Sequence, residues 1–163
     1  MGYTLELFAA GRAGLVAGWV TSADEADRWC SRAEHPFPAS VVAGWSGQDD
    51  VTAYLLVDPD GVPVAYGEVW SDDAAGEAEL ARLLVAPAAR GRGVGRVLVG
   101  ALVGVAGYDD VFLRVRPDNA VALASYRGAG FDDVAPELQA EWNAPQPRPY
   151  IWLRYAPGPG PGG

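Results

Sequence analysis

The sequence contains no lysine, so all 12 of its basic residues are arginines, set against 21 acidic residues. This absence excludes a Walker-type phosphate loop, in which a lysine reaches the phosphates of a nucleotide. It also excludes an enzyme that forms a Schiff base through a lysine amine. The formal net charge of −9 argues against general nucleic-acid binding, which requires a basic face.

Cysteine and histidine are nearly absent too, because Cys30 and His35 are the only residues of their types. A single cysteine rules out an intrachain disulfide and suits a reducing cytoplasm. One cysteine and one histidine do not make a typical zinc site, so we expect no metal.

Long apolar runs are also missing, since none approaches the ~20 residues of a membrane span. The first residues show neither the basic region nor the apolar core of a secretion signal. We therefore expect a cytoplasmic protein that does not contact membranes. At 163 residues, of which 50% are hydrophobic, the chain suffices for one domain with a substantial core. We expect this domain to span residues 3–156, and residues 157–163, all proline or glycine, to form a disordered tail.

The segment 80–105 has the pattern of a buried strand, a glycine-rich turn and a helix. Residues 80–85 are almost wholly apolar, as in a strand buried on both faces. Pro87 ends this strand, because proline lacks the amide that a strand ladder needs. From residue 94 onward, apolar residues recur at helical spacing. The glycines therefore stand at a helix start, where free N–H groups and the helix dipole favour a phosphate: Gly91, Gly93 and Gly95.

A second motif follows a strand that the pattern predicts at residues 111–116. Residues 119–131 read as a helix that carries Asn119 and Tyr126 and closes on Gly-Phe. This motif resembles the later motif of the GCN5-related N-acetyltransferase superfamily. The pattern Arg90-x-x-Gly93-x-Gly95 resembles the acyl-CoA pyrophosphate loop of the same superfamily, and the two motifs occur in the expected order.

This resemblance implies a single α/β domain with a mixed, mostly antiparallel sheet and helices on both faces. It implies direct transfer of an acetyl group from acetyl-CoA to a primary amine, without a covalent enzyme intermediate. The alternatives are transfer of another acyl group, acetylation of a protein N-terminus or peptide, and a non-catalytic acyl-CoA-binding module. A homodimer is also open.

The resemblance further implies which residues contact acetyl-CoA. Pantetheine would bond to the backbone of three strand residues, Leu83, Leu84 and Val85. The pyrophosphate would lie on the loop and helix start, formed by Arg90, Gly91, Arg92, Gly93, Val94, Gly95 and Arg96. In this loop the amides of residues 91–96 bind the phosphates and the arginines add positive charge. Asn119 would contact acetyl-CoA or serve only as a helix N-cap.

Acyl transfer to an amine needs a group that accepts a proton and benefits from one that donates a proton. Tyr126 matches the superfamily's proton donor, although a tyrosine there could also simply pack with its hydroxyl satisfied. Glu68 and Glu79 are the candidate bases, because an acid inside an apolar strand needs a partner or a purpose. Alternatively, each glutamate forms only a salt bridge, for instance to Arg82 or Arg114. The resemblance also allows a base that acts through ordered water.

The charge is unevenly distributed along the chain. Residues 1–80 carry 14 acidic residues and three arginines, whereas residues 81–163 carry seven acidic residues and nine arginines. A negative field would attract a cation, so we expect the acceptor to be a cationic small molecule. Trp45, Trp70 and Trp142 are candidates for lining its pocket through cation–π contacts.

The remaining pattern predicts further elements on both sides of the motifs. Strands are expected at residues 3–8, 51–57, 62–70, 77–85, 131–134 and 150–155, and helices at residues 23–33 and 119–129. Residues 39–45 are expected to form a short helix or a turn. The helix at residue 23 follows a capping-box pattern from Ser22 to Glu25. Along the strand at 77–85, we expect Glu79, Ala81 and Leu83 to share one face.

Overall fold

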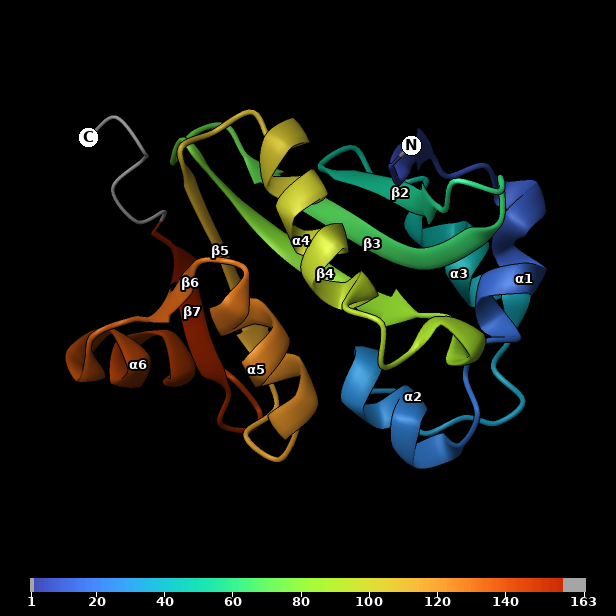
Figure 1. The fold of residues 1–163 in the computed structure, drawn as a ribbon. Coiled ribbons are helices and arrows are strands. Elements are labelled where there is room, and N and C mark those ends of the chain that lie inside the picture. The colour runs from blue at the N-terminus through green and yellow to red at the C-terminus, as the bar shows by residue number, and fades with distance from the viewer. Residues whose placement is uncertain (1, 157–163) are drawn as a thin grey trace.

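The computed structural model describes residues 2–156 as one seven-stranded sheet with helices packed against it (Figure 1). Residue 1 and the expected tail, residues 157–163, lie outside the described residues. The strands are β1 (Thr4–Leu7), β2 (Val51–Val57), β3 (Pro63–Asp72), β4 (Glu77–Val85), β5 (Asp110–Val115), β6 (Phe131–Asp133) and β7 (Ile151–Tyr155). The α-helices are α1 (Ala13–Ala17), α2 (Ala23–Cys30), α3 (Ala39–Trp45), α4 (Val94–Val105), α5 (Ala120–Gly128) and α6 (Pro136–Asn143), with 3₁₀ turns η1 (Ala10–Arg12) and η2 (Pro87–Ala89).

The sheet has the strand order β1-β2-β3-β4-β5-β7-β6. Strands β1 to β4 form an antiparallel meander, and β7 pairs antiparallel with both β5 and β6. Only β4 and β5 are parallel, because α4 carries the chain back across the sheet between them. The mixed, mostly antiparallel sheet that the resemblance implied is therefore confirmed.

Helices cover both faces of this sheet, which confirms the second part of the fold prediction. Figure 1 shows α4 crossing in front of β3 and β4, while α3 lies behind them. On the α4 side, Leu98 and Leu102 are fully buried. On the opposite side, Trp29 of α2 packs edge-on against Trp45 of α3 and against Tyr66 of β3.

Helix α2 begins as its sequence pattern predicts but ends early. The Ser22 hydroxyl accepts a hydrogen bond from the Glu25 amide at 3.1 Å, so the predicted cap is present. Ser31 then adopts a left-handed conformation with φ 62°, which stops the helix at Cys30. The prediction that this helix runs to residue 33 is therefore wrong, because a left-handed residue cannot continue an α-helix.

Helix α6 was not predicted, because the segment between β6 and β7 is rich in proline. Pro136 stands at the first turn of the helix, where the missing amide costs nothing. The helix is anchored to β7 and to the residue that precedes it by two amide side chains. Gln139 donates to the Trp152 carbonyl at 2.7 Å, and Asn143 donates to the Tyr150 carbonyl at 2.9 Å.

Candidate active site

Strands β4 and β5 pair only at their beginnings and then separate. Their register runs from Glu77 opposite Asp110 to Glu79 opposite Phe112 and includes no later residue. A cavity of about 560 Å³ is bounded by β4, by the end of β5, and by parts of α2, α4 and α5. The separation of two parallel strands has thus produced a cavity in the middle of the sheet.

A β-bulge in β4 shapes one wall of this cavity. Arg82 and Leu83 together stand opposite the single residue Gly67 of β3, where the register shifts. Arg82 absorbs the extra residue with a left-handed backbone, φ 49°. A bulge of this kind bends the strand and redirects the side chains that follow it.

The bulge overturns one of the face assignments made from the sequence. Leu83 does not share the face of Glu79 and Ala81, because its side chain lies 2.9 Å from the point where a Cβ on Gly67 would be. The same Cβ would lie 2.8 Å from Leu102 of α4. Leu83 therefore points to the α4 side, and a side chain at Gly67 would crowd it.

The glycine-rich loop leaves the start of α4 open to the cavity. Gly91 and Gly93 have φ of 77° and 76°, a region that favours glycine. Gly93 is the N-cap of α4 and offers no capping side chain. The first amides of the helix therefore lack partners within the helix and are available to an anion. The loop residues in the cavity wall are Arg90, Gly91, Gly93, Val94 and Gly95.

The three loop arginines occupy different environments. Arg90 donates to both carboxylate oxygens of Glu25 at 2.8 and 3.0 Å and to the Val85 carbonyl at 3.1 Å. Burial alone would raise the pKa of Glu25, but the Arg90 guanidinium and the hydrogen bonds that Thr21 donates together outweigh burial, so the pKa is lowered. Arg92 and Arg96 are exposed and lie outside the cavity wall. Arg90 therefore ties the loop to α2.

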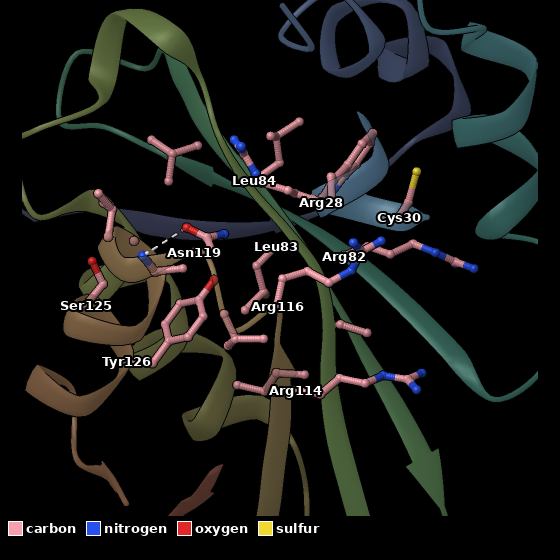
Figure 2. A pocket seen from close by; sticks show the side chains of 18 of the residues that line it. Arg28, Cys30, Arg82, Leu83, Leu84, Arg114, Arg116, Asn119, Ser125 and Tyr126 are labelled. Carbon is pink, nitrogen blue, oxygen red and sulfur yellow. Dashed lines mark hydrogen bonds between the residues drawn. The ribbon is translucent and has the colours of Figure 1, made fainter. Parts of the chain in front are cut away.

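Helix α5 contributes Asn119 and Tyr126 to the wall, as Figure 2 shows. The Asn119 side chain accepts a hydrogen bond from the Ala122 amide at 3.3 Å, so it does cap the helix. In Figure 2 the Tyr126 hydroxyl points toward the cavity. Burial raises the pKa of this phenol above its usual range, so the hydroxyl keeps its proton at neutral pH.

Glu79 lines the cavity, and its pKa is shifted from the usual value. Its side chain is 12% exposed and lies 3.0 Å from Nε of Arg114. Burial raises the pKa of Glu79 to about 7, and the nearby Arg114 offsets only part of this effect. The ion pair suggested as an alternative is thus present, yet the carboxylate is still suited to exchange protons near neutrality.

Glu68 is placed differently. It is fully buried, and its oxygens accept hydrogen bonds from the Tyr66 hydroxyl, from Trp70 Nε1 at 2.7 Å and from Arg82 Nη1 at 2.9 Å. It is not part of the cavity wall. Of the two candidate bases, only Glu79 therefore faces the space where a substrate would bind.

Helix α2 closes one side of the cavity and is held from two directions. Arg116, at the end of β5, donates to the Asp27 carbonyl at 2.8 Å and to the Ser31 hydroxyl at 3.3 Å. Arg90 holds the other end through Glu25. Cys30 also lines the cavity, and burial raises the pKa of its thiol to about 11.

A search against protein-family models matches residues 18–131 to the acetyltransferase (GNAT) family. This match covers more than half of the chain and includes both sequence motifs. The chain belongs to the acetyltransferase (GNAT) family. The resemblance that was drawn from the two motifs is therefore confirmed.

Curated relatives within this family match only in part. A mycothiol acetyltransferase of Clavibacter sepedonicus is 35% identical over 133 residues, which is 72% of this chain and 43% of the relative. The N-alpha-acetyltransferase RimI of Mycobacterium tuberculosis is 47% identical over 58 residues, 36% of this chain and 37% of the relative. The chain thus spans less than half the length of these relatives.

Solved structures of acetyltransferases share the fold. A structure of AAC(6′)-Ib with paromomycin and acetyl-CoA has a TM-score of 0.73 and 20% identity, covering 96% of this chain and 94% of that one. A spermidine N-acetyltransferase of Vibrio cholerae with CoA and spermine has a TM-score of 0.71 and 16% identity, covering 94% and 93%. At such identities the likeness establishes the GNAT fold alone.

Several residues of this GNAT cavity were not assigned to the site from the sequence. Arg82 and Arg114 were considered only as salt-bridge partners, and Trp29, Arg116 and Tyr150 were not considered there. An arginine inside an apolar strand was the available signal, since it needs a partner or a purpose just as a glutamate does.

Of the three tryptophans that were considered, Trp70 lines the cavity and Trp45 stacks on Arg82 beside it. Trp142 instead packs against Phe112, Trp152 and Arg154.

Within residues 2–156, no helix is long and apolar enough to cross a membrane. The same residues contain no group of three or more potential metal ligands.

Proposed function

We propose that this GNAT chain is an acyl-CoA-dependent N-acetyltransferase, which moves an acetyl group from acetyl-CoA directly to a primary amine. One observation carries the proposal. A single cavity is lined by the start of α4, which suits an anion, by the Tyr126 phenol, and by the Glu79 carboxylate with a pKa of about 7. These are the three groups that acyl transfer from a phosphate-bearing thioester requires.

In this proposal acetyl-CoA binds where the sequence motifs meet the cavity. The open amides of residues 94–96 take the pyrophosphate, and Gly91 and Gly93 allow it to approach the backbone closely. Leu83, Leu84 and Val85 line the gap between β4 and β5, where the backbone groups that Arg90 does not engage would bond to pantetheine. Asn119 lines the cavity while it caps α5, so the two roles are compatible.

The chemistry divides between two side chains. Acetyl-CoA supplies the acetyl group as a thioester. Glu79 accepts a proton from the ammonium group of the acceptor, directly or through water, which frees the lone pair on nitrogen. As the new C–N bond forms and the C–S bond breaks, Tyr126 donates its proton to the departing sulfur. The nitrogen, which becomes positively charged as the C–N bond forms, gives its second proton to the Tyr126 phenolate directly or through water, and Glu79 releases its proton to solvent.

The acceptor in this proposal is a small molecule with a protonated primary amine. Two acidic residues line the cavity, Glu25 and Glu79, and each is paired with an arginine. The acidic surface of residues 1–80 would therefore act on a cationic acceptor during approach more than in the cavity itself. The match to a protein N-alpha-acetyltransferase favours a protein or peptide N-terminus as the second candidate.

A screen of amines tests the proposal. Purified protein is incubated with acetyl-CoA and a library of small amines, polyamines and peptides, and both CoA release and product mass are measured. The proposal expects amine-dependent CoA release with a matching acetylated product. Acetyl-CoA binding without any acetylated product would instead identify a non-catalytic binding module.

A further inference from the structure

Of the five arginines that line the cavity, three lie on or directly after strands β4 and β5. They are Arg82 of β4, Arg114 of β5 and Arg116, which follows β5. Figure 2 shows the side chains of all three extending from the strands to the same side, away from Tyr126. A substrate that enters from this side therefore meets guanidinium groups first.

The three guanidinium groups differ in how many of their N–H donors already bond to protein groups. Arg116 donates through both terminal nitrogens to Asp27 and Ser31. Arg114 places Nε on Glu79 at 3.0 Å and Nη1 on Gln146 at 2.9 Å. Among the described residues, the Arg82 side chain makes one hydrogen bond, from Nη1 to Glu68 at 2.9 Å. Arg82 therefore has the largest number of donors left for a ligand.

Arg82 is also held rigidly. Its guanidinium carbon lies 4.1 Å from the ring centre of Trp45 and 4.9 Å from that of Trp70. Stacking of this kind occupies the faces of the guanidinium plane and leaves its N–H edge for acceptors in the plane. Its partner Glu68 is 0% exposed and already accepts three hydrogen bonds. A ligand therefore meets the positive member of this ion pair and not the negative one.

The backbone at Arg82 indicates independently that this side chain has a functional role. Strict alternation along β4 would place Arg82 on the opposite face from Glu79 and Ala81. The bulge places its side chain on their face instead, at the cost of a left-handed φ of 49°. Strain of this kind in a non-glycine residue is unfavourable and concentrates at functional sites.

We infer that the acceptor amine also carries a carboxylate, and that Arg82 binds this carboxylate through its free N–H edge. The inference rests on the proposed acetyl transfer and names the substrate class as small amino carboxylates. Guanidinium and carboxylate match as a two-pronged pair, which fixes orientation as well as adding affinity. The ammonium group of the same molecule then faces Glu79. Arg82 is thus the specificity-determining residue, while Glu79 and Tyr126 perform the chemistry.

A panel of matched compounds tests this inference. Glycine, β-alanine and γ-aminobutyrate vary the spacing between amine and carboxylate, and phenylalanine adds a side chain at the spacing of glycine. Each is compared with its own carboxamide, which keeps the amine. Two quantities are measured for every compound: kcat/KM for acetylation, and Kd for the CoA-saturated protein by calorimetry. We expect at least one carboxylate to exceed its carboxamide more than tenfold in both.

Variants of the protein assign the effect to Arg82. Removing Arg82 alone would leave Glu68 charged and buried, so the test uses the double variant Arg82→Gln with Glu68→Gln. This variant should lose more than tenfold in kcat/KM for the preferred carboxylate and less than about twofold for its carboxamide. The control is Arg127→Gln with Asp133→Asn, which removes an exposed ion pair of α5 and β6 and should change neither value.

The outcomes separate the inference from the proposed function. If carboxamides bind and react as well as carboxylates, or if the double variant lowers both equally, the inference is overturned while acetyl transfer stands. If carboxylates bind selectively through Arg82 but no amine is acetylated, the proposed function fails and the anion subsite stands.

Discussion

At the scale of single residues, Glu68 and Glu79 differ because of what surrounds them. Both stand on the same face of neighbouring strands, and each is paired with an arginine. Glu68 accepts three hydrogen bonds inside the protein, so its charge is compensated and inaccessible. Glu79 has one arginine beside it and lines the cavity, and burial raises its pKa to about 7. The same side chain is structural in one place and suited to proton transfer in the other.

Glu79→Gln should lower kcat and remove one limb of the pH profile. The base acts only when ionised, so kcat/KM of the parent should fall as pH drops below about 7, the pKa of Glu79. The glutamine variant should lack this limb, because it has no carboxylate to protonate. Measurement of acetylation rates from acidic to neutral pH checks this. Glu68→Gln serves as the comparison and should mainly raise the acceptor KM through Arg82. An unchanged limb in Glu79→Gln would assign the base elsewhere.

Tyr126→Phe should lower kcat by roughly tenfold to a hundredfold, at or below the usual contribution of a general acid. The KM for acetyl-CoA should change little, because a proton donor acts mainly in the transition state. Burial raises the pKa of Tyr126, so the parent keeps its proton throughout the neutral range. Steady-state kinetics of both proteins decide the matter, and equal turnover would remove Tyr126 from the mechanism.

At the scale of elements, regular periodicity was predictable and local irregularity was not. The bounds of α3, β2, β4 and α4 match those expected from their apolar patterns. The bulge of β4 was missed, because nothing in an apolar run marks where one residue is unpaired. Helix α6 was missed because the segment between β6 and β7 is rich in proline, yet Pro136 stands at the first turn of a helix, where proline is common.

The bulge predicts that Gly67→Ala destabilises the protein. The new Cβ would lie 2.8 Å from Leu102 and 2.9 Å from Leu83, and Leu102 is fully buried. Such overpacking costs about 1–3 kcal/mol in the free energy of unfolding. Gly104→Ala is the matched control, because its Cβ meets nothing within 4 Å and alanine favours a helix by about 0.5–1 kcal/mol. Denaturant unfolding should show opposite signs for the two variants, and equal stability would argue against the described packing at Gly67.

The start of α4 predicts how acetyl-CoA binding responds to a side chain in the loop. Gly93→Val introduces a Cβ that meets no protein atom within 4 Å, at a residue with φ of 76°. We expect the variant to fold but to bind acetyl-CoA more than tenfold more weakly, a loss of about 1.4 kcal/mol. The side chain blocks the approach of the pyrophosphate, and valine strains the left-handed backbone that presents the loop amides. Gly100→Ala, on the same helix, is the control. Unchanged affinity by calorimetry in a folded Gly93→Val variant would contradict this binding mode.

At the scale of the whole molecule, the site exists because distant segments meet. Arg90 reaches Glu25 across 65 residues of sequence, and Arg116 reaches Asp27 across 89. The motifs of the loop and of α5 could be recognised from the sequence, since each is local. The pairing of arginines with acids, and hence the charge of the cavity wall, could not be predicted, because it depends on which strands separate and which helix covers them.

In the proposed mechanism, both substrates occupy the cavity together and the acetyl group passes between them directly. Cys30 is the thiol in the wall, but burial raises its pKa to about 11 and its Sγ donates to the Ala26 carbonyl at 3.4 Å. A protonated thiol is a poor nucleophile, so an acetylated enzyme is not expected.

Initial-rate kinetics with both substrates varied, paired with mass spectrometry of the protein, test this directly. The account predicts intersecting reciprocal plots, unchanged protein mass after incubation with acetyl-CoA alone, and normal turnover in Cys30→Ser. Parallel plots, together with an acetyl group on Cys30 that an amine then removes, would contradict it.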